Sequence, residues 1–296
     1  MKNVLNKLIT FFLLIIGWFA KFLSVKQRNS FGKIVGDSLR LLGKNRKQVT
    51  YENISNAFPS NSITENKKIL IDSYRNLGIT LIELLVLRYL TDEEVKEYIK
   101  FSNIDLLVEK YNEGRGLILM SGHYGNWELL AYSVKTYTGI PVQIIVKPQS
   151  NEAADKLLNS YRTKGGNTIV SMYKAALSIV RTLKKGGVIA MLVDQSATKD
   201  KDIFVDFFNR PAATYIATAE LALSLDCPII IGFAVRNDDC TYRVDLSEIK
   251  FDDIKGKDDA VRILTERHVK ALENQIRSNP SLWSWQHKRW KHTPES

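Results

Sequence analysis

A histidine followed five residues later by a glutamate is the first group in the chain that could do chemistry. His123 and Glu128 lie in the stretch Ser-Gly-His-Tyr-Gly-Asn-Trp-Glu. Five positions on one α-helix differ by about 140° of rotation, so the two side chains cannot point the same way from a regular helix. We therefore expect His123 in a turn, Asn126 as the cap of the following helix, and Glu128 in its first turns. Glu128 would then bond one imidazole nitrogen and leave the other as a base toward a hydroxyl.

Other chemistries fit the pair less well. Ser121 lies before the glycines that open the helix, and the chain has no Gly-x-Ser-x-Gly elbow, so a serine hydrolase is disfavoured. A metal site is disfavoured because there is no His-Glu-x-x-His pattern and no nearby cysteine. A chance spacing, with a histidine that only caps the helix, is the non-catalytic alternative. If the protein supplies no nucleophile, the attacking hydroxyl belongs to a substrate, which indicates direct group transfer.

Strands alternating with helices position these residues. Apolar strand-like runs occupy 117–120, 142–146, 168–170, 188–193 and 229–235, and helical patterns occupy 127–137, 152–162, 173–185 and 213–225. This alternation predicts an α/β fold with a mostly parallel mixed sheet flanked by helices. Three of the runs lead into polar residues, namely His123, Lys147 and the pair Asp194-Gln195. Because the carboxyl ends of parallel strands face the ligand crevice, we expect these side chains to converge there.

The first 28 residues predict a hydrophobic membrane-anchor helix. Residues 8–20 read LITFFLLIIGWFA and are flanked by lysines. Thirteen helical residues span about 20 Å, less than the roughly 30 Å of a hydrocarbon core, so the helix crosses only marginally or lies in the interface. If it crosses, the positive charges after it would keep the remaining chain cytoplasmic. A cleaved signal peptide is disfavoured, because Trp18 and Lys21 stand where small residues should precede the cleavage site.

Residues 29–296 are expected to form a single domain, with a helical part at 29–100 and an α/β catalytic part at 101–296. The net charge of +10 indicates an anionic partner, which could be a nucleic acid, an acidic protein or a phospholipid surface. The anchor and the lack of a nucleic-acid-binding motif favour the membrane surface. The two cysteines, Cys227 and Cys240, fit a reducing compartment.

The order of several short motifs resembles one family, the lipid A biosynthesis acyltransferases, which are late acyltransferases within the group that carries a His-x4-Asp/Glu motif. After the hydrophobic segment, the resemblance rests on motifs at residues 53–59, 73–78, 121–128, 146–148, 161–162, 194–195, 205–214 and 283–291. It implies a bacterial inner-membrane enzyme with its catalytic domain facing the cytoplasm. Such an enzyme moves a fatty acyl chain from acyl carrier protein to a hydroxyl of a lipid A precursor. The carrier thioester is already activated, so the reaction needs no metal or other cofactor.

The resemblance also implies roles for particular residues. His123 would be the general base and Glu128 its orienting partner. Arg162 would contact a phosphate or carbonyl group, and Asp194 would support the site. Arg289, in the basic tail, would contact acceptor phosphates, although a tail that snorkels to the membrane is an alternative.

The chain departs from the family pattern at three places. Lys147 stands where arginine is common, which removes bidentate phosphate binding. Ser196 replaces the second aspartate of an Asp-Gln-Asp motif, and Asn209 replaces a glycine. The resemblance therefore specifies the acyl transfer more closely than it specifies the acceptor. The alternatives are transfer to an amino-acid lipid or pigment precursor, a lipid hydrolase in which His123 activates water, and a scaffold that binds lipid without turnover.

Overall fold

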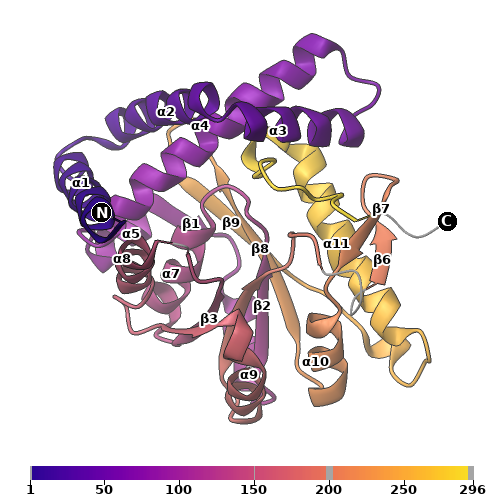
Figure 1. The fold of residues 1–296 in the computed structure, drawn as a ribbon. Helices are drawn as coiled ribbons and strands as arrows, with labels where there is room; N and C mark the ends of the chain where they lie inside the picture. The colour runs from indigo at the N-terminus through magenta and orange to yellow at the C-terminus, as the bar shows by residue number, and fades with distance from the viewer. Residues whose placement is uncertain (1, 150, 198–202, 293–296) are drawn as a thin grey trace.

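A seven-stranded sheet forms the centre of the computed structural model, which describes residues 2–149, 151–197 and 203–292 (Figure 1). Its strands are β1 (Ile99–Phe101), β2 (Leu117–Ser121), β3 (Val142–Val146), β4 (Thr168–Ser171), β5 (Val188–Leu192), β8 (Ile229–Arg236) and β9 (Tyr242–Glu248). They lie in the order β1-β9-β8-β2-β5-β3-β4. The strands from β8 to β4 are all parallel, whereas β9 is antiparallel to β8 and parallel to β1. The predicted α/β fold with a mostly parallel mixed sheet is confirmed.

Helices cover both faces of the sheet, as Figure 1 shows with α7 and α8 on one side and α10 and α11 on the other. The helices are α1 (Lys2–Ala20), α2 (Val25–Leu42), α3 (Lys44–Ala57), α4 (Ile63–Leu87), α5 (Asp92–Tyr98), α6 (Asp105–Asn112), α7 (Trp127–Thr138), α8 (Glu152–Arg162), α9 (Ala175–Lys184), α10 (Ala217–Leu225) and α11 (Ala260–Ser278). Short 3-10 turns occur at η1 (Met172–Lys174), η2 (Asp252–Ile254) and η3 (Pro280–Leu282).

Strand β2 shows why its sequence reads as a continuous apolar run. Successive side chains of a strand point to opposite faces of the sheet. Leu117 and Leu119 belong to the core beneath α7 and α8, whereas Ile118 and Met120 belong to the core beneath α9 and α11. Because both faces are buried, the strand has no polar alternation.

Five strands and most helices lie where the sequence predicts them. The predicted helix 213–225 begins later, at α10, because Ala213 and Thr214 belong to β7 (Pro211–Thr214). This short strand pairs antiparallel with β6 (Ile203–Asp206) in a separate hairpin that the sequence did not predict. The division of the chain at residue 29 stays a prediction.

The N-terminal hydrophobic segment is the helix α1, with large apolar side chains on its surface. Phe11, Phe12, Trp18 and Phe19 of this helix, and Phe22 just after it, are all more than half exposed. The described part of the chain contains no helix whose length and apolar composition suffice to cross a membrane.

Helix α4 joins the N-terminal helices to the sheet. Its Gly78 packs against α2 so closely that a Cβ there would lie 2.2 Å from the carbonyl oxygen of Gly32. Further along α4, the Thr80 hydroxyl donates a hydrogen bond of 2.9 Å to the carbonyl oxygen of Gly125, in the loop after β2. The Asn76 amide donates to the carbonyl oxygen of Leu282 in η3 (3.0 Å). Helix α4 therefore holds both the loop and the C-terminal tail in place.

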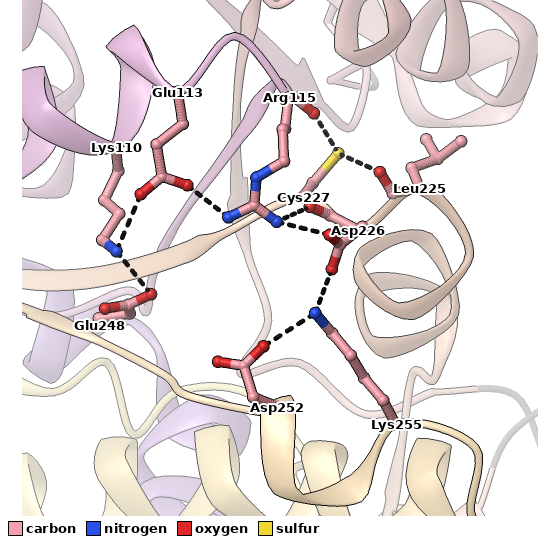
Figure 2. A network of polar contacts seen from close by, with 9 residues as sticks. All are labelled: Lys110, Glu113, Arg115, Leu225, Asp226, Cys227, Glu248, Asp252 and Lys255. Atoms are coloured by element: carbon pink, nitrogen blue, oxygen red, sulfur yellow. Dashed lines mark hydrogen bonds and ion pairs between the residues drawn. The ribbon is translucent and has the colours of Figure 1, made fainter.

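A polar network ties the chain together near the start of β2, the end opposite to the loop that carries His123 (Figure 2). Arg115 donates to the Asp226 carboxylate (2.7 Å), which also pairs with Lys255 (2.6 Å). The Cys227 thiol donates to the carbonyl oxygen of Arg115 (2.9 Å). These contacts join the entries of the adjacent strands β2 and β8 to η2.

Candidate active site

A tight loop after β2 places His123 at the carboxyl end of the sheet. Gly125 adopts a φ of +56°, and a Cβ there would lie 1.7 Å from the carbonyl oxygen of Ala234, so only glycine fits. The His123 carbonyl oxygen accepts a hydrogen bond from the backbone N–H of Ser284 in the tail (2.9 Å). Asn126 accepts from the backbone N–H of Leu129 (2.9 Å), which confirms the predicted cap of α7.

The His123 ring is oriented by Asp194. Nδ1 of His123 lies 2.8 Å from Oδ1 of Asp194, while the His123 backbone N–H and the Trp283 indole N–H each donate to Oδ2 at 2.8 Å. The carboxylate is only 2 % exposed. The register of β2 with β5 explains the meeting, since Ser121 lies opposite Leu192 and the next residues leave the sheet side by side.

Opposing effects act on the pKa values of this pair. Burial by itself would raise the pKa of Asp194, but the His123 charge and the hydrogen bonds from His123 and Trp283 outweigh it and lower that pKa. Burial would lower the pKa of His123, but the charge and hydrogen bond of Asp194 raise it above its ordinary value, and the Glu128 charge adds to this. Asp194 is therefore ionised and the imidazole is a stronger base than a free histidine.

Glu128 does not make the predicted hydrogen bond to His123. Its carboxylate instead forms a bidentate ion pair with Arg162, at 2.6 Å to Nη2 and 2.9 Å to Nε. The Trp127 indole N–H also donates to Glu128 (3.2 Å), and the Trp127 ring lies edge-on to the His123 ring with centroids 5.0 Å apart. The rotation along α7 turns Glu128 toward α8, so it forms no hydrogen bond with His123. It acts on the imidazole through its charge and through its contact with Trp127.

Of the other predicted binding residues, Lys147 is exposed to solvent and Arg289 is buried. Lys147 is exposed just after β3, and its charge contributes in a minor way to lowering the pKa of His287, behind burial and the charge of His123. Arg289 is 1 % exposed and donates to the Ala213 carbonyl oxygen (2.7 Å) and the Thr214 hydroxyl (2.8 Å). Its guanidinium therefore faces protein rather than solvent, and burial lowers its pKa to about 10. Within the described ranges, no group of three or more histidine, cysteine, aspartate and glutamate side chains could hold a metal ion.

Two further side chains face the His123 ring. Nε2 of Gln195 lies 3.4 Å from Nε2 of His123 and 2.9 Å from Nε2 of His287. The sequence shows both residues within motifs, Asp-Gln and Trp-Gln-His-Lys, but assigns neither a role there. Only the return of the tail across the strand ends places His287 5.6 Å from His123, measured between ring centroids.

Replacing Asp194 by asparagine should lower the pKa of His123. The substitution removes the negative charge and charge-assisted hydrogen bond that raise it. NMR titration of histidine-labelled protein measures this pKa directly. The chain has only four histidines, so their signals can be assigned individually. Asp252→Asn, on the exposed η2 turn, is the matched control and should leave His123 unchanged. An unaltered His123 titration in Asp194→Asn would show that Asp194 does not set its basicity.

The Glu128–Arg162 pair should show strong coupling in a double-mutant cycle. Glu128→Gln or Arg162→Gln alone leaves a mostly buried charge without its partner, which costs about 3–5 kcal/mol of unfolding free energy. The double variant should recover about 1–3 kcal/mol of the summed loss. Chemical denaturation measures these energies, and the exposed Glu152–Lys156 pair on the same helix should give coupling near zero. Additive losses at Glu128 and Arg162 would exclude a functional ion pair.

Comparison with known proteins shows the family to which the chain belongs. The family model described as bacterial lipid A biosynthesis acyltransferase matches residues 2–292. The lipid A biosynthesis palmitoleoyltransferase of Escherichia coli K12 is 22% identical over 265 residues, covering 89% of this chain and 84% of the relative. A lipid A biosynthesis acyltransferase of Haemophilus influenzae is 24% identical over 86% of this chain and 80% of its own length. The Escherichia coli K12 lauroyltransferase is 23% identical, with shares of 85% and 81%. The chain therefore belongs to the bacterial lipid A biosynthesis acyltransferase family.

Proposed function

We propose that the protein transfers a fatty acyl group from acyl carrier protein to a hydroxyl of a lipid A precursor, with His123 as general base. The observation that carries the proposal is the His123–Asp194 pair, in which a buried carboxylate holds Nδ1 and leaves Nε2 for a proton. In the described part of the chain, the polar partners of this ring are Asp194 and Gln195, and neither carries a hydroxyl or thiol. The attacking hydroxyl is therefore assigned to the acceptor lipid.

The reaction balances with His123 as the only proton carrier. As the acceptor oxygen forms a bond to the thioester carbon, Nε2 of His123 takes the hydroxyl proton and the carbonyl π electrons move to the oxygen. The tetrahedral intermediate then collapses, the carbon–sulfur bond breaks, and the His123 proton passes to the departing sulfur. Asp194 stabilises the imidazolium between the two steps and stays ionised.

Charge supports both proposed substrates. Acyl carrier protein is acidic and lipid A precursors carry phosphates, and the chain has a net charge of +10. The exposed Lys147 and the exposed tail residues Lys288 and Lys291 are the cations we propose for acceptor phosphates. Arg162 and Arg289 are better described as supports, because Arg162 is bonded to Glu128 and Asn159 and Arg289 is buried.

The test supplies the purified full chain with labelled acyl carrier protein and a lipid A precursor and identifies the product by mass spectrometry. His123→Ala should reduce transfer by about 10²–10⁴-fold, as expected for the loss of a general base. Asp252→Asn, on the exposed η2 turn near the opposite end of the sheet, is the control and should retain activity. Free fatty acid without an acylated acceptor would favour a hydrolase, and transfer only to an amino-acid lipid or pigment precursor would replace the acceptor assignment.

We also propose that α1 binds the membrane surface by lying in the interface, on the cytoplasmic side of the bacterial inner membrane. Its exposed aromatic side chains suit the boundary between head groups and acyl chains. The Lys21 ammonium lies over the rings of Trp18, Phe22 and Tyr89, at 5.8, 4.7 and 5.2 Å from their centroids. It can therefore remain near the head groups while these rings contact lipid.

Replacing Phe11, Trp18 and Phe22 together by serine should weaken binding to vesicles that contain anionic lipid, since the burial of three large apolar side chains is lost. Cosedimentation measures bound protein. A matched triple variant of exposed uncharged residues in α2 and α3, with Ser30, Ser38 and Asn45 changed to alanine, retains those rings and should bind far more tightly than the serine variant. Equal binding by the two variants would contradict an interfacial α1.

A further inference from the structure

The Gln195 side chain lies between two histidines. Its Nε2 is 2.9 Å from Nε2 of His287 and 3.4 Å from Nε2 of His123. The shorter contact has ordinary hydrogen-bond length, whereas the longer one is weak. The Gln195 amide nitrogen therefore makes a normal hydrogen bond to His287 and a weak one to His123, and the weak one can be displaced by another group.

The chemistry of the neighbours decides which end of the amide faces His123. The ionised Asp194 can only accept hydrogen bonds, so Nδ1 of the neutral His123 ring carries the proton. Nε2 of His123 is then an acceptor, and the group that faces it must be the NH₂ end of Gln195. Burial, with the His123 charge next, lowers the pKa of His287 to about 4, so this ring is neutral and its Nε2 can accept the other amide hydrogen.

The backbone fixes the position of His287. The buried Asn53 side chain, in α3, donates to the carbonyl oxygens of both Trp285 (2.8 Å) and His287. The Arg289 backbone N–H donates to the same His287 carbonyl oxygen (2.9 Å). These hydrogen bonds fix the backbone of the tail before and after His287, and so fix the imidazole that bonds Gln195.

We propose that the Gln195 amide is the oxyanion donor of the acyl transfer and that His287 is the positioning residue that aims it. An acceptor hydroxyl that bonds to Nε2 of His123 would displace the weak Gln195 contact. The freed amide hydrogen then lies beside the attacked carbon, where the carbonyl oxygen gains the π electrons as the carbon–oxygen bond forms. It donates to that oxygen until the carbon–sulfur bond breaks and the His123 proton passes to sulfur. Such a donor stabilises the transition state more than the bound substrate.

This inference rests on the proposed acyl transfer, but its test separates the two. Gln195→Ala and the near-isosteric Gln195→Glu, which has no N–H to donate, should lower kcat by about 10²–10³-fold with little change in KM. Gln143→Ala, a partly buried glutamine on the neighbouring strand β3, is the control and should retain kcat. A Gln195 variant that raises KM and keeps kcat would overturn the inference and leave the role of His123 intact.

Two further measurements distinguish positioning from general structure. His287→Ala should lower kcat, whereas His287→Asn, whose amide oxygen can accept from Gln195, should recover part of the loss. Equal losses in the two variants would overturn the role of His287. Hydrolysis of the acyl carrier protein thioester by the wild-type chain passes through the same oxyanion, so it reports on Gln195 even if no lipid A precursor is acylated. Hydrolysis unaffected by Gln195→Ala would overturn the inference independently of the acceptor.

Discussion

The buried Asp194 carboxylate is the interaction on which the arrangement depends. A charge that is 2 % exposed is stable only when donors surround it, and removing one partner of such a pair costs several kcal/mol. Its donors come from the loop after β2 and from the C-terminal tail, which are separated by most of the catalytic part of the chain. The same contacts that satisfy the carboxylate therefore orient His123 and bring the tail across the strand ends.

The rest of the fold holds those partners in register. Both faces of β2 are buried, so a shift by one residue would move each set of apolar side chains into the core on the opposite face of the sheet, where the packing is built around other side chains. At its carboxyl end, Gly125 makes a close approach that no other residue permits, and α4 bonds the loop through Thr80. At its other end, the ionic network around Asp226 joins the strand entries. The position of His123 is thus constrained from both ends of one strand.

Two carboxylates act on the imidazole in different ways. Asp194 bonds it directly, whereas Glu128 is neutralised largely by Arg162 and lies behind the Trp127 indole. In this chain, the spacing of His123 and Glu128 therefore does not produce a hydrogen bond between the two residues, because Glu128 pairs with Arg162 at the end of α8. The relatives named above are only 22–24% identical, so the contacts of His123 support the proposed mechanism more specifically than overall similarity does.

The sequence by itself determined the α/β alternation, five of the strands, the Asn126 cap and the positions of polar residues directly after strands, because these follow from local periodicity and backbone preference. It left out β1, β9 and the β6–β7 hairpin, whose short or mixed runs are stabilised by partners distant in the chain. Only the tertiary structure decided that Asp194 rather than Glu128 bonds His123, that Arg289 is buried, and that His287 holds Gln195. Those outcomes depend on strand order and on the path of the tail, which no local pattern encodes.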